Sequence, residues 1–394
     1  MTTLKAVIGA NYGDEGKGKM TDYFAYKSEK KCIVVCSNGG AQRGHTVLTI
    51  DKGQHIFHHF GSGTFAGADT YLPSQYIVNP MIFMKEYREI YPVNSQVYVN
   101  ENALCSTPYD MIANQIIEES RGINKHGSCG VGIWETILRN EATVGDMLKM
   151  TYEQMKRYLQ GVRDSYYLLR LKSKHIDIPS NWESIFFNDN LIENYIYDFQ
   201  HMVRCMNFTT DDILKRYSTV IFENGQGLLL DQNIKNSQYS TPSNTGSKNI
   251  KKMVQDVFGD EYEMEVCYVT RSYLTRHGEG ELPSEISMPR FKLDTLSETN
   301  TWNKNQGSFR YGILNVNDLI NRITEDFNDY WDIKQSSMSL AITHWDENQI
   351  DTSKIKCKIY YGTGAERTAI LAPINRTLNC IYGWYKWTKS AKFE

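Results

Sequence analysis

The sequence predicts an α/β fold: a mostly parallel central sheet flanked by helices, with long helical insertions. Short apolar segments of strand length recur along the chain. They alternate with segments in which apolar residues return every three to four positions, as on one face of a helix. Strands that alternate with helices build parallel sheets covered by helices. Glycine-rich loops also follow the first two strand-like segments directly, and α/β folds bind ligands at the carboxyl ends of their strands.

The expected strands are apolar runs bounded by polar or glycine-rich segments, namely Leu4–Gly9, Cys32–Ser37, Gln96–Val99, Thr219–Phe222, Glu265–Val269, Met338–Ile342 and Lys356–Tyr361. Helical periodicity is found in Met20–Tyr26, Tyr152–Leu171 and Val316–Phe327. A helical insertion is expected around residues 150–215, which are rich in tyrosine, asparagine and aspartate. Because the composition does not change along the chain and no linker-like segment occurs, we expect one domain over residues 1–394.

Composition and charge limit the possible partners. Hydrophobic residues make up 41% and charged residues 23% of the chain, as in ordinary globular proteins. The net charge of −3 gives no basic field that would attract nucleic acid or an anionic membrane. No apolar run has the length of a membrane helix, and the N-terminal residues lack the layout of a signal peptide. The eight scattered cysteines fit a reducing compartment. We therefore expect a cytoplasmic protein that binds neither nucleic acid nor membranes.

The loop Gly13–Lys19 lies between an expected strand and an expected helix and is P-loop-like. Its glycines let backbone N–H groups converge on phosphate oxygens, while Lys19 and the helix N-terminus supply positive charge. Met20 stands where a hydroxyl residue usually follows the lysine. Asp14 and Glu15 add carboxylates, which are unfavourable beside phosphates unless they bind a metal ion or move a proton. The loop predicts a nucleotide site that contains an acid–base group; the alternative is a glycine-rich turn without function.

A second glycine-rich loop, Asn38–Thr46, follows the next expected strand. Its small residues allow the backbone to approach a ligand closely, and His45 stands where a general acid is needed. A single histidine is more often structural. However, the carboxyl ends of neighbouring parallel strands meet at one edge of a sheet, so both loops are expected to face the same crevice.

Six motifs resemble those of the adenylosuccinate synthetase family, in the family's order. They are Gly13–Lys19, Gly44–Thr46, Gly127–Ile133, Phe222–Gly227, Ser240–Thr245 and Thr275–Glu285. The segment Tyr360–Arg367 resembles the family's C-terminal base-site turn. The resemblance covers most of the chain. It implies a ligase that condenses L-aspartate with IMP, driven by GTP and Mg²⁺, and a homodimer.

The resemblance also implies catalytic roles. Asp14 would remove the N1 proton of the purine, so that O6 attacks the γ-phosphate of the triphosphate. His45 would donate to the γ-phosphate oxygens during the transfer. Mg²⁺ would bind Asp14 and the Gly44 carbonyl, and Lys17 would lie beside the transferring phosphate. The amine of L-aspartate would then displace the phosphate from the purine.

Three binding sets follow from the same motifs. The donor triphosphate is expected at Gly13, Glu15, Gly16, Gly18, Lys19, Gly44, Thr46, His344, Asp346, Gly362 and Gly364. The acceptor monophosphate is expected at Asn38, Gln42, Ser128, Cys129, Gln226, Thr241 and His277, with Arg139 reaching its phosphate across the dimer interface. L-Aspartate is expected at Asn305, Gln306, Gly307, Ser308 and Arg310.

The chain departs from the family pattern at four places. Gln42 replaces an asparagine, and Cys129 replaces a threonine that would bind the acceptor phosphate more strongly. In the aspartate loop, a run of arginines is reduced to Arg310. The guanine-reading Thr-Lys-x-Asp segment is Thr343–Asp346, with His344 in place of the lysine. GTP is therefore not assured as the donor, and ATP is the alternative.

Ser308 bears on the acceptor, because the arginine that it replaces lies near the ribose 2′-hydroxyl in the family. A site without that donor discriminates less against a deoxyribose. In phages that carry diaminopurine in their DNA, relatives act on dGMP and often use ATP or dATP, and we favour dGMP as the acceptor here. The alternatives are IMP with GTP, with Arg276 covering the hydroxyl instead, and a nucleotide-binding switch of the P-loop class without ligase activity.

Overall fold

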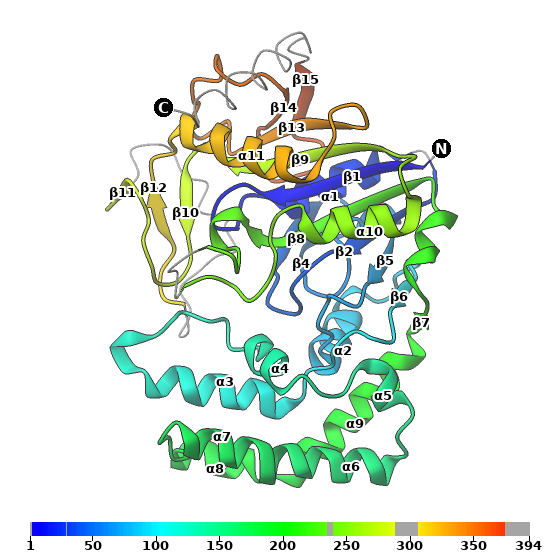
Figure 1. The fold of residues 1–394 in the computed structure, drawn as a ribbon, viewed down its shortest axis with the longest axis vertical. Helices are drawn as coiled ribbons and strands as arrows, with labels where there is room; N and C mark the ends of the chain where they lie inside the picture. Colours follow the sequence, from blue (N-terminus) through cyan, green and yellow to red (C-terminus); the bar gives the residue numbers. More distant parts are fainter. Residues whose placement is uncertain (1, 29, 235–238, 288–305, 375–394) are drawn as a thin grey trace.

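A ten-stranded sheet runs through the upper part of the molecule and carries the loops that were expected to bind ligands (Figure 1). The computed structural model describes residues 2–28, 30–234, 239–287 and 306–374. The strand order is β15-β14-β13-β9-β1-β8-β2-β5-β6-β7. All neighbouring strands of this sheet are parallel except β14 and β15, which are antiparallel. The expected α/β architecture is confirmed.

The strands of the large sheet are β1 (Thr3–Gly9), β2 (Cys32–Cys36), β5 (Asp69–Leu72), β6 (Val97–Val99), β7 (Met206–Phe208), β8 (Thr219–Gly227), β9 (Glu263–Arg271), β13 (Ser336–Thr343), β14 (Lys358–Gly362) and β15 (Ile370–Ile374). Two small sheets contain β3 (His45–Thr49) with β4 (Gly53–Phe57), and β10 (Leu274–Arg276) with β11 (Glu285–Ile286) and β12 (Arg310–Gly312). Every expected strand is present. The strands that were not expected are short or carry few apolar residues, so a periodic pattern cannot show in them.

Alternation along β1 explains why both faces of the sheet are covered. Leu4, Ala6 and Ile8 pack into the core cluster beneath α10 (Lys248–Phe258) and α11 (Val316–Tyr330). Val7 points to the opposite face, where Met20 of α1 (Lys17–Tyr26) packs. A strand buried on both faces needs apolar residues at nearly every position, as parallel strands have. The sheet is therefore a rigid support for the loops at its edge.

A layer of helices with a core of its own lies below the sheet in Figure 1. It consists of α2 (Pro80–Ile90), α3 (Pro108–Ser120), α4 (Ile133–Arg139), α5 (Val144–Leu148), α6 (Tyr152–Gly161), α7 (Leu168–Ser173), α8 (Ser180–Phe186) and α9 (Asp189–Arg204). The expected helix Tyr152–Leu171 is continuous through a π-helical segment, Val162–Tyr167. Short 3₁₀ segments occur at Thr64–Ala66, Gly122–Asn124, Asp211–Arg216 and Leu228–Leu230. Among the described helices, none has the length and apolar character needed to cross a membrane.

Candidate active site

One large cleft opens at the carboxyl ends of the central strands, and most of the predicted site residues line it. Its volume is about 1280 Å³, more than the roughly 300–1,000 Å³ of an ordinary small-molecule pocket, so it has room for more than one ligand. Predicted residues that line it are Gly13, Asp14, Gly16, Lys17, Gly18, Lys19, Gln42, Gly44, His45, Thr46, Ser128, Cys129, Gln226, Thr241, His277, Gln306, His344, Asp346 and Gly364. The two glycine-rich loops thus face one crevice, as expected from the strand order.

The backbone of the first loop turns sharply at Asp14, which has a φ of 59°. The Asp14 carbonyl accepts a hydrogen bond from Arg271 Nε at 2.6 Å. Burial raises the pKa of the Asp14 carboxyl, and the nearby charges of Arg271 and Lys17 oppose this shift. Gly16 has no room for a side chain, because a Cβ there would lie 2.9 Å from Cγ2 of Thr343. The loop therefore presents Asp14 to the cleft in a fixed conformation.

The Glu15 carboxylate points into the first loop and away from the cleft. It accepts hydrogen bonds from the backbone N–H groups of Asn11 and Gly13, at 2.9 and 2.8 Å. It also forms a buried ion pair with Lys17 at 2.8 Å. The side chain fills the inside of the loop and is not among the residues that line the cleft. The prediction that Glu15 contacts the nucleotide is corrected accordingly: Glu15 shapes the loop and fixes Lys17.

Lys19 lies further along the loop, where its ammonium donates to the carbonyl oxygens of Gly364 and, at 3.0 Å, Ala369. A Cβ at Gly362 would lie 2.9 Å from the same ammonium, so Gly362 acts by making room and does not line the cleft. Lys19 therefore joins the phosphate loop to the C-terminal turn.

The charge of Lys19 is expected to depend on pH in the working range. Burial lowers its pKa to about 8, so the free enzyme loses this positive charge as the pH rises through that value. We expect kcat/KM for the triphosphate to fall above about pH 8, because kcat/KM reports the free enzyme. A pH profile of kcat/KM measures this fall. The Lys19→Met variant should have a low kcat/KM that does not fall further at alkaline pH. A wild-type profile that stays flat well above that pH would contradict the assignment.

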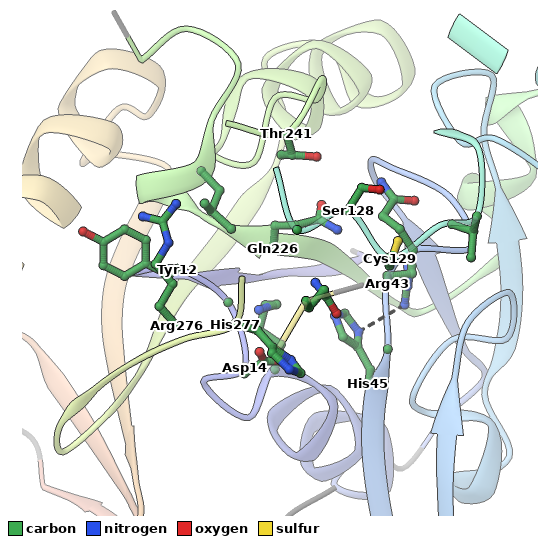
Figure 2. Close-up of a pocket in the computed structure, with 18 of the residues that line it drawn as sticks. Tyr12, Asp14, Arg43, His45, Ser128, Cys129, Gln226, Thr241, Arg276 and His277 are labelled. Atoms are coloured by element: carbon green, nitrogen blue, oxygen red, sulfur yellow. Dashed lines mark hydrogen bonds between the residues drawn. The ribbon is translucent and has the colours of Figure 1, made fainter. Parts of the chain in front are cut away.

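His45 belongs to a buried triad with Glu223 and Arg43. The Nδ1 atom of His45 lies 2.9 Å from Oε1 of Glu223, and the guanidinium of Arg43 pairs with the same carboxylate. Figure 2 shows the Arg43–His45 contact, which measures 3.3 Å. Burial lowers the pKa of His45 to about 4, although Glu223 opposes the shift. The carboxylate holds the Nδ1 proton and so fixes the orientation of the ring.

The part of the cleft where the acceptor is expected contains two half-buried glutamines. Both polar atoms of the Gln42 amide and the Oε1 atom of Gln226 lack a hydrogen-bond partner in the described part of the chain. Gln226 is held at a φ of 56° on the end of β8, and Figure 2 shows it between Thr241 and Asp14. Ser128 exchanges hydrogen bonds with Asn114. Burial raises the pKa of Cys129 to about 11, so its thiol is neutral.

Two predicted acceptor residues do not line the cleft. The Asn38 amide binds the backbone of Gly225 and, at 2.9 Å, Oγ of Ser243. It therefore ties the second loop to the end of β8 and is not available for a nucleotide. The role predicted for Arg139 is corrected too, because its guanidinium is fully buried in an ion pair with Asp110 at 2.8 Å. It cannot reach a phosphate in a partner subunit without breaking that pair.

The Arg139–Asp110 pair predicts a stability effect. Arg139→Met removes the guanidinium and leaves a buried carboxylate without its partner, so the free energy of unfolding should fall by about 3–5 kcal/mol. Denaturant unfolding measures this change, with Arg88→Met on the surface of α2 as the control. The KM for the acceptor should stay near the wild-type value at a temperature where the variant is folded. A large rise in that KM with unchanged stability would restore the predicted phosphate contact.

At the donor-base end of the cleft, His344 is paired with a carboxylate that the sequence did not draw attention to. His344 has a φ of 55°, and its Nδ1 atom lies 2.9 Å from Glu347. The Tyr273 hydroxyl donates to the other oxygen of Glu347 at 2.7 Å. Asp346 lines the cleft beside them. The base-reading end of the site is therefore more acidic than a Thr-Lys-x-Asp segment would make it.

Only part of the predicted aspartate loop reaches the cleft. Gln306 lines it, whereas Gly307 and Ser308 do not, and Ser308 is exposed. Arg310 is bound elsewhere, through an ion pair with Glu285 and hydrogen bonds to carbonyl groups. Asn305 lies outside the described residues. Gly307, Ser308 and Arg310, which were predicted to bind L-aspartate, therefore do not line the cleft of this structure.

Comparisons with known proteins agree with this arrangement. The model of a protein family described as adenylosuccinate synthetase matches residues 6–314. The adenylosuccinate synthetases of Clostridium beijerinckii and Lactobacillus acidophilus are each 28% identical to this chain, over 320 and 293 residues. The alignments cover 78% and 72% of this chain and 69% and 65% of those proteins.

Two solved structures share the fold. The fully ligated adenylosuccinate synthetase from Plasmodium falciparum has a TM-score of 0.62 at 18% identity, over 93% of this chain and 82% of that one. The succinoaminodeoxyadenylate synthetase of cyanophage S-2L has a TM-score of 0.63 at 14% identity, over 98% and 99% of the two chains. Since the family model spans more than half of the chain, this protein belongs to the adenylosuccinate synthetase family and is a ligase that forms a carbon–nitrogen bond.

Proposed function

We propose that this ligase uses dGMP as the acceptor and yields the 2-amino form of the succinylated product. The observation that carries the proposal is the state of the aspartate loop. Ser308 is exposed and does not line the cleft, and Arg310 is paired with Glu285. Neither residue offers a guanidinium to a ribose 2′-hydroxyl. A site that does not bind this hydroxyl gains nothing from a ribonucleotide, which favours a deoxyribonucleotide.

The purine end of the site supports an acceptor with an additional amino group. The Gln42 and Gln226 side chains each present a buried amide oxygen without a partner in the described part of the chain. Buried acceptors of this kind are costly unless a ligand donates to them, and a guanine base carries an exocyclic 2-amino donor that hypoxanthine lacks. The cyanophage S-2L protein of the same fold was solved bound to dGMP and dATP as an energy donor, which adds support.

In the proposed reaction, Asp14 takes the N1 proton of the purine, and O6 attacks the γ-phosphorus of the triphosphate. The bond from this phosphorus to the β,γ-bridging oxygen breaks, and the nucleoside diphosphate leaves with the electron pair. In the free enzyme the pKa of His45 lies at about 4, and the negative charge of the bound triphosphate would raise it, so that the cleft-facing nitrogen takes up a proton. His45, oriented by Glu223, then donates from this nitrogen to the γ-phosphate oxygens as their charge develops. Lys17, fixed by Glu15, lies beside the transferring group. The neutral amine of L-aspartate then attacks C6 and loses a proton to solvent, and inorganic phosphate leaves with the C–O electron pair.

The residues present fit Mg²⁺. Asp14 lines the cleft together with Gly44, and burial raises the pKa of its carboxyl, so a cation beside it would stabilise the charged form. Mg²⁺ commonly takes one or two protein oxygens and completes its shell with water and phosphate oxygens. When bound, it would neutralise charge on the triphosphate.

The test crosses acceptors with donors. The enzyme, Mg²⁺ and L-aspartate are incubated with dGMP, GMP, IMP or dIMP, each with ATP or GTP, and the products are identified by mass. We expect product from dGMP, with a lower kcat/KM for GMP, and we expect ATP to support the reaction. Turnover of IMP with none of dGMP would overturn the proposed acceptor and favour IMP with GTP, the second candidate. Sedimentation of the same preparation tests the predicted homodimer.

A further inference from the structure

Arg276, at the end of β10, is a buried cation that faces the cleft. Its exposed fraction is 6%, and it lines the cleft. Its Nη1 atom donates to the Glu281 carbonyl at 2.8 Å, whereas its Nε atom has no hydrogen-bond partner. Among the described residues, no carboxylate forms an ion pair with it. Burying a charge without a counter-charge is expensive, so this guanidinium is prepared for an anion that the described part of the chain does not supply.

Aromatic rings hold the guanidinium in place. Its centre lies 4.7 Å from the ring centroid of Tyr12 and 5.9 Å from that of Tyr239. A side chain at Gly280 would collide with the Nη2 atom. Figure 2 shows Tyr12 and Arg276 together on one wall, with Gln226 between them and Ser128. A guanidinium stacked on a ring keeps its N–H edges free for planar, two-point recognition of an oxyanion.

The position of Arg276 connects it to the aspartate loop. In the small sheet, Arg276 of β10 is the direct cross-strand partner of Arg310 of β12. The Arg310 guanidinium donates from Nε to Oε1 of Glu285 at 2.8 Å and from Nη1 to the carbonyl oxygen of Gly280 at 2.8 Å. Of these two neighbouring arginines, Arg310 is therefore paired within the protein, and Arg276 lies in the cleft with no carboxylate partner in the described part of the chain.

We propose that Arg276, positioned by Tyr12, binds a carboxylate of L-aspartate. Both the amino acid and the nucleotides bring anionic oxygens, but the phosphates already have the glycine-rich loops at residues 13–19 and 127–132. L-Aspartate has two carboxylates, and the surviving arginine of its predicted loop is occupied. The inference depends on the ligase chemistry and not on the choice of dGMP, so it is tested with whichever acceptor the wild-type enzyme turns over.

The test compares Arg276→Ala and Arg276→Lys with the wild type. We expect the KM for L-aspartate to rise by about 30- to 100-fold in Arg276→Ala, the loss for a charged hydrogen-bonded contact. The KM values for the acceptor and the triphosphate should stay within about twofold. Arg276→Lys should recover little, because an ammonium lacks the planar fork. Adding guanidinium ions at millimolar concentration should restore part of the aspartate-dependent rate of Arg276→Ala only.

Controls separate this role from a structural one. Arg88→Ala, on the surface of α2, removes an arginine outside the cleft and should change none of the three KM values. Tyr12→Leu removes the stacking ring and should raise the KM for aspartate less than Arg276→Ala does. If Arg276→Ala is unfolded by circular dichroism, the KM values for L-aspartate of the folded Arg276→Lys and Tyr12→Leu proteins decide. A rise confined to the KM of a nucleotide would assign Arg276 to the phosphate or the ribose of that nucleotide, and unchanged KM values would remove it from the site; either result overturns the proposal.

Discussion

Asp14→Asn is expected to reduce kcat by about 10³-fold, within the range of about 10²- to 10⁴-fold that a positioned general base supplies. The carboxylate is the proposed acceptor of the purine N1 proton, and an amide cannot accept it. Asparagine has nearly the same shape and tolerates a positive φ better than most residues, so the backbone turn at 59° should survive. The loss should therefore be chemical, with little change in stability.

Positional isotope exchange within the triphosphate measures the first step, phosphoryl transfer, separately from product formation. If Asp14 acts in the first step, scrambling of label between the bridging and non-bridging oxygens should be lost together with product formation. Asp51→Asn, at an exposed turn between β3 and β4, is a matched control and should leave both rates unchanged. Scrambling at a near-normal rate in Asp14→Asn would show that another group takes the N1 proton.

Most of the fold could be predicted because the pattern of apolar residues within each central strand identifies that strand. The central strands β1, β2, β8, β9 and β13 are apolar over most of their length, and a parallel strand buried on both faces leaves this pattern in the sequence. The strand β5, between β2 and β6, and the edge strand β7 are four and three residues long, too short for any periodicity. Their place in the sheet is set by pairing with distant segments, which a single sequence does not reveal.

The parts of the site formed by glycine-rich loops could be predicted from the sequence. The parts that depend on which side chains form ion pairs with one another could not. Glycine-rich loops after strands identified Asp14 and His45 correctly as cleft residues. Nothing in the sequence distinguished Arg139, which is paired with Asp110, from Arg276, which has no carboxylate partner among the described residues. Ion pairs between residues far apart in the chain decide which charges remain for ligands, and only the three-dimensional arrangement shows them.

Glu223→Gln carries the second large expected effect, a reduction of kcat by about 10²- to 10³-fold. The carboxylate raises the pKa of His45 against the lowering effect of burial, and it fixes the ring through Nδ1 at 2.9 Å. His45 must carry a proton on the cleft-facing nitrogen to donate to the transferring phosphate. An amide keeps the shape but removes the charge that stabilises the protonated ring, so phosphoryl transfer should slow while binding changes less.

Because Glu223 also pairs with Arg43, a loss of activity alone does not separate orientation of His45 from general damage. The double variant Glu223→Gln/His45→Asn separates them. If Glu223 acts through His45, the double variant should be no slower than His45→Asn alone, since residues that act as a unit are not additive. Multiplicative losses would mean that Glu223 supports the reaction by another route, through Arg43 and the fold of the second loop. Thermal unfolding of all three proteins shows whether each is folded at the assay temperature, so the comparison reports the chemistry of the His45–Glu223 pair.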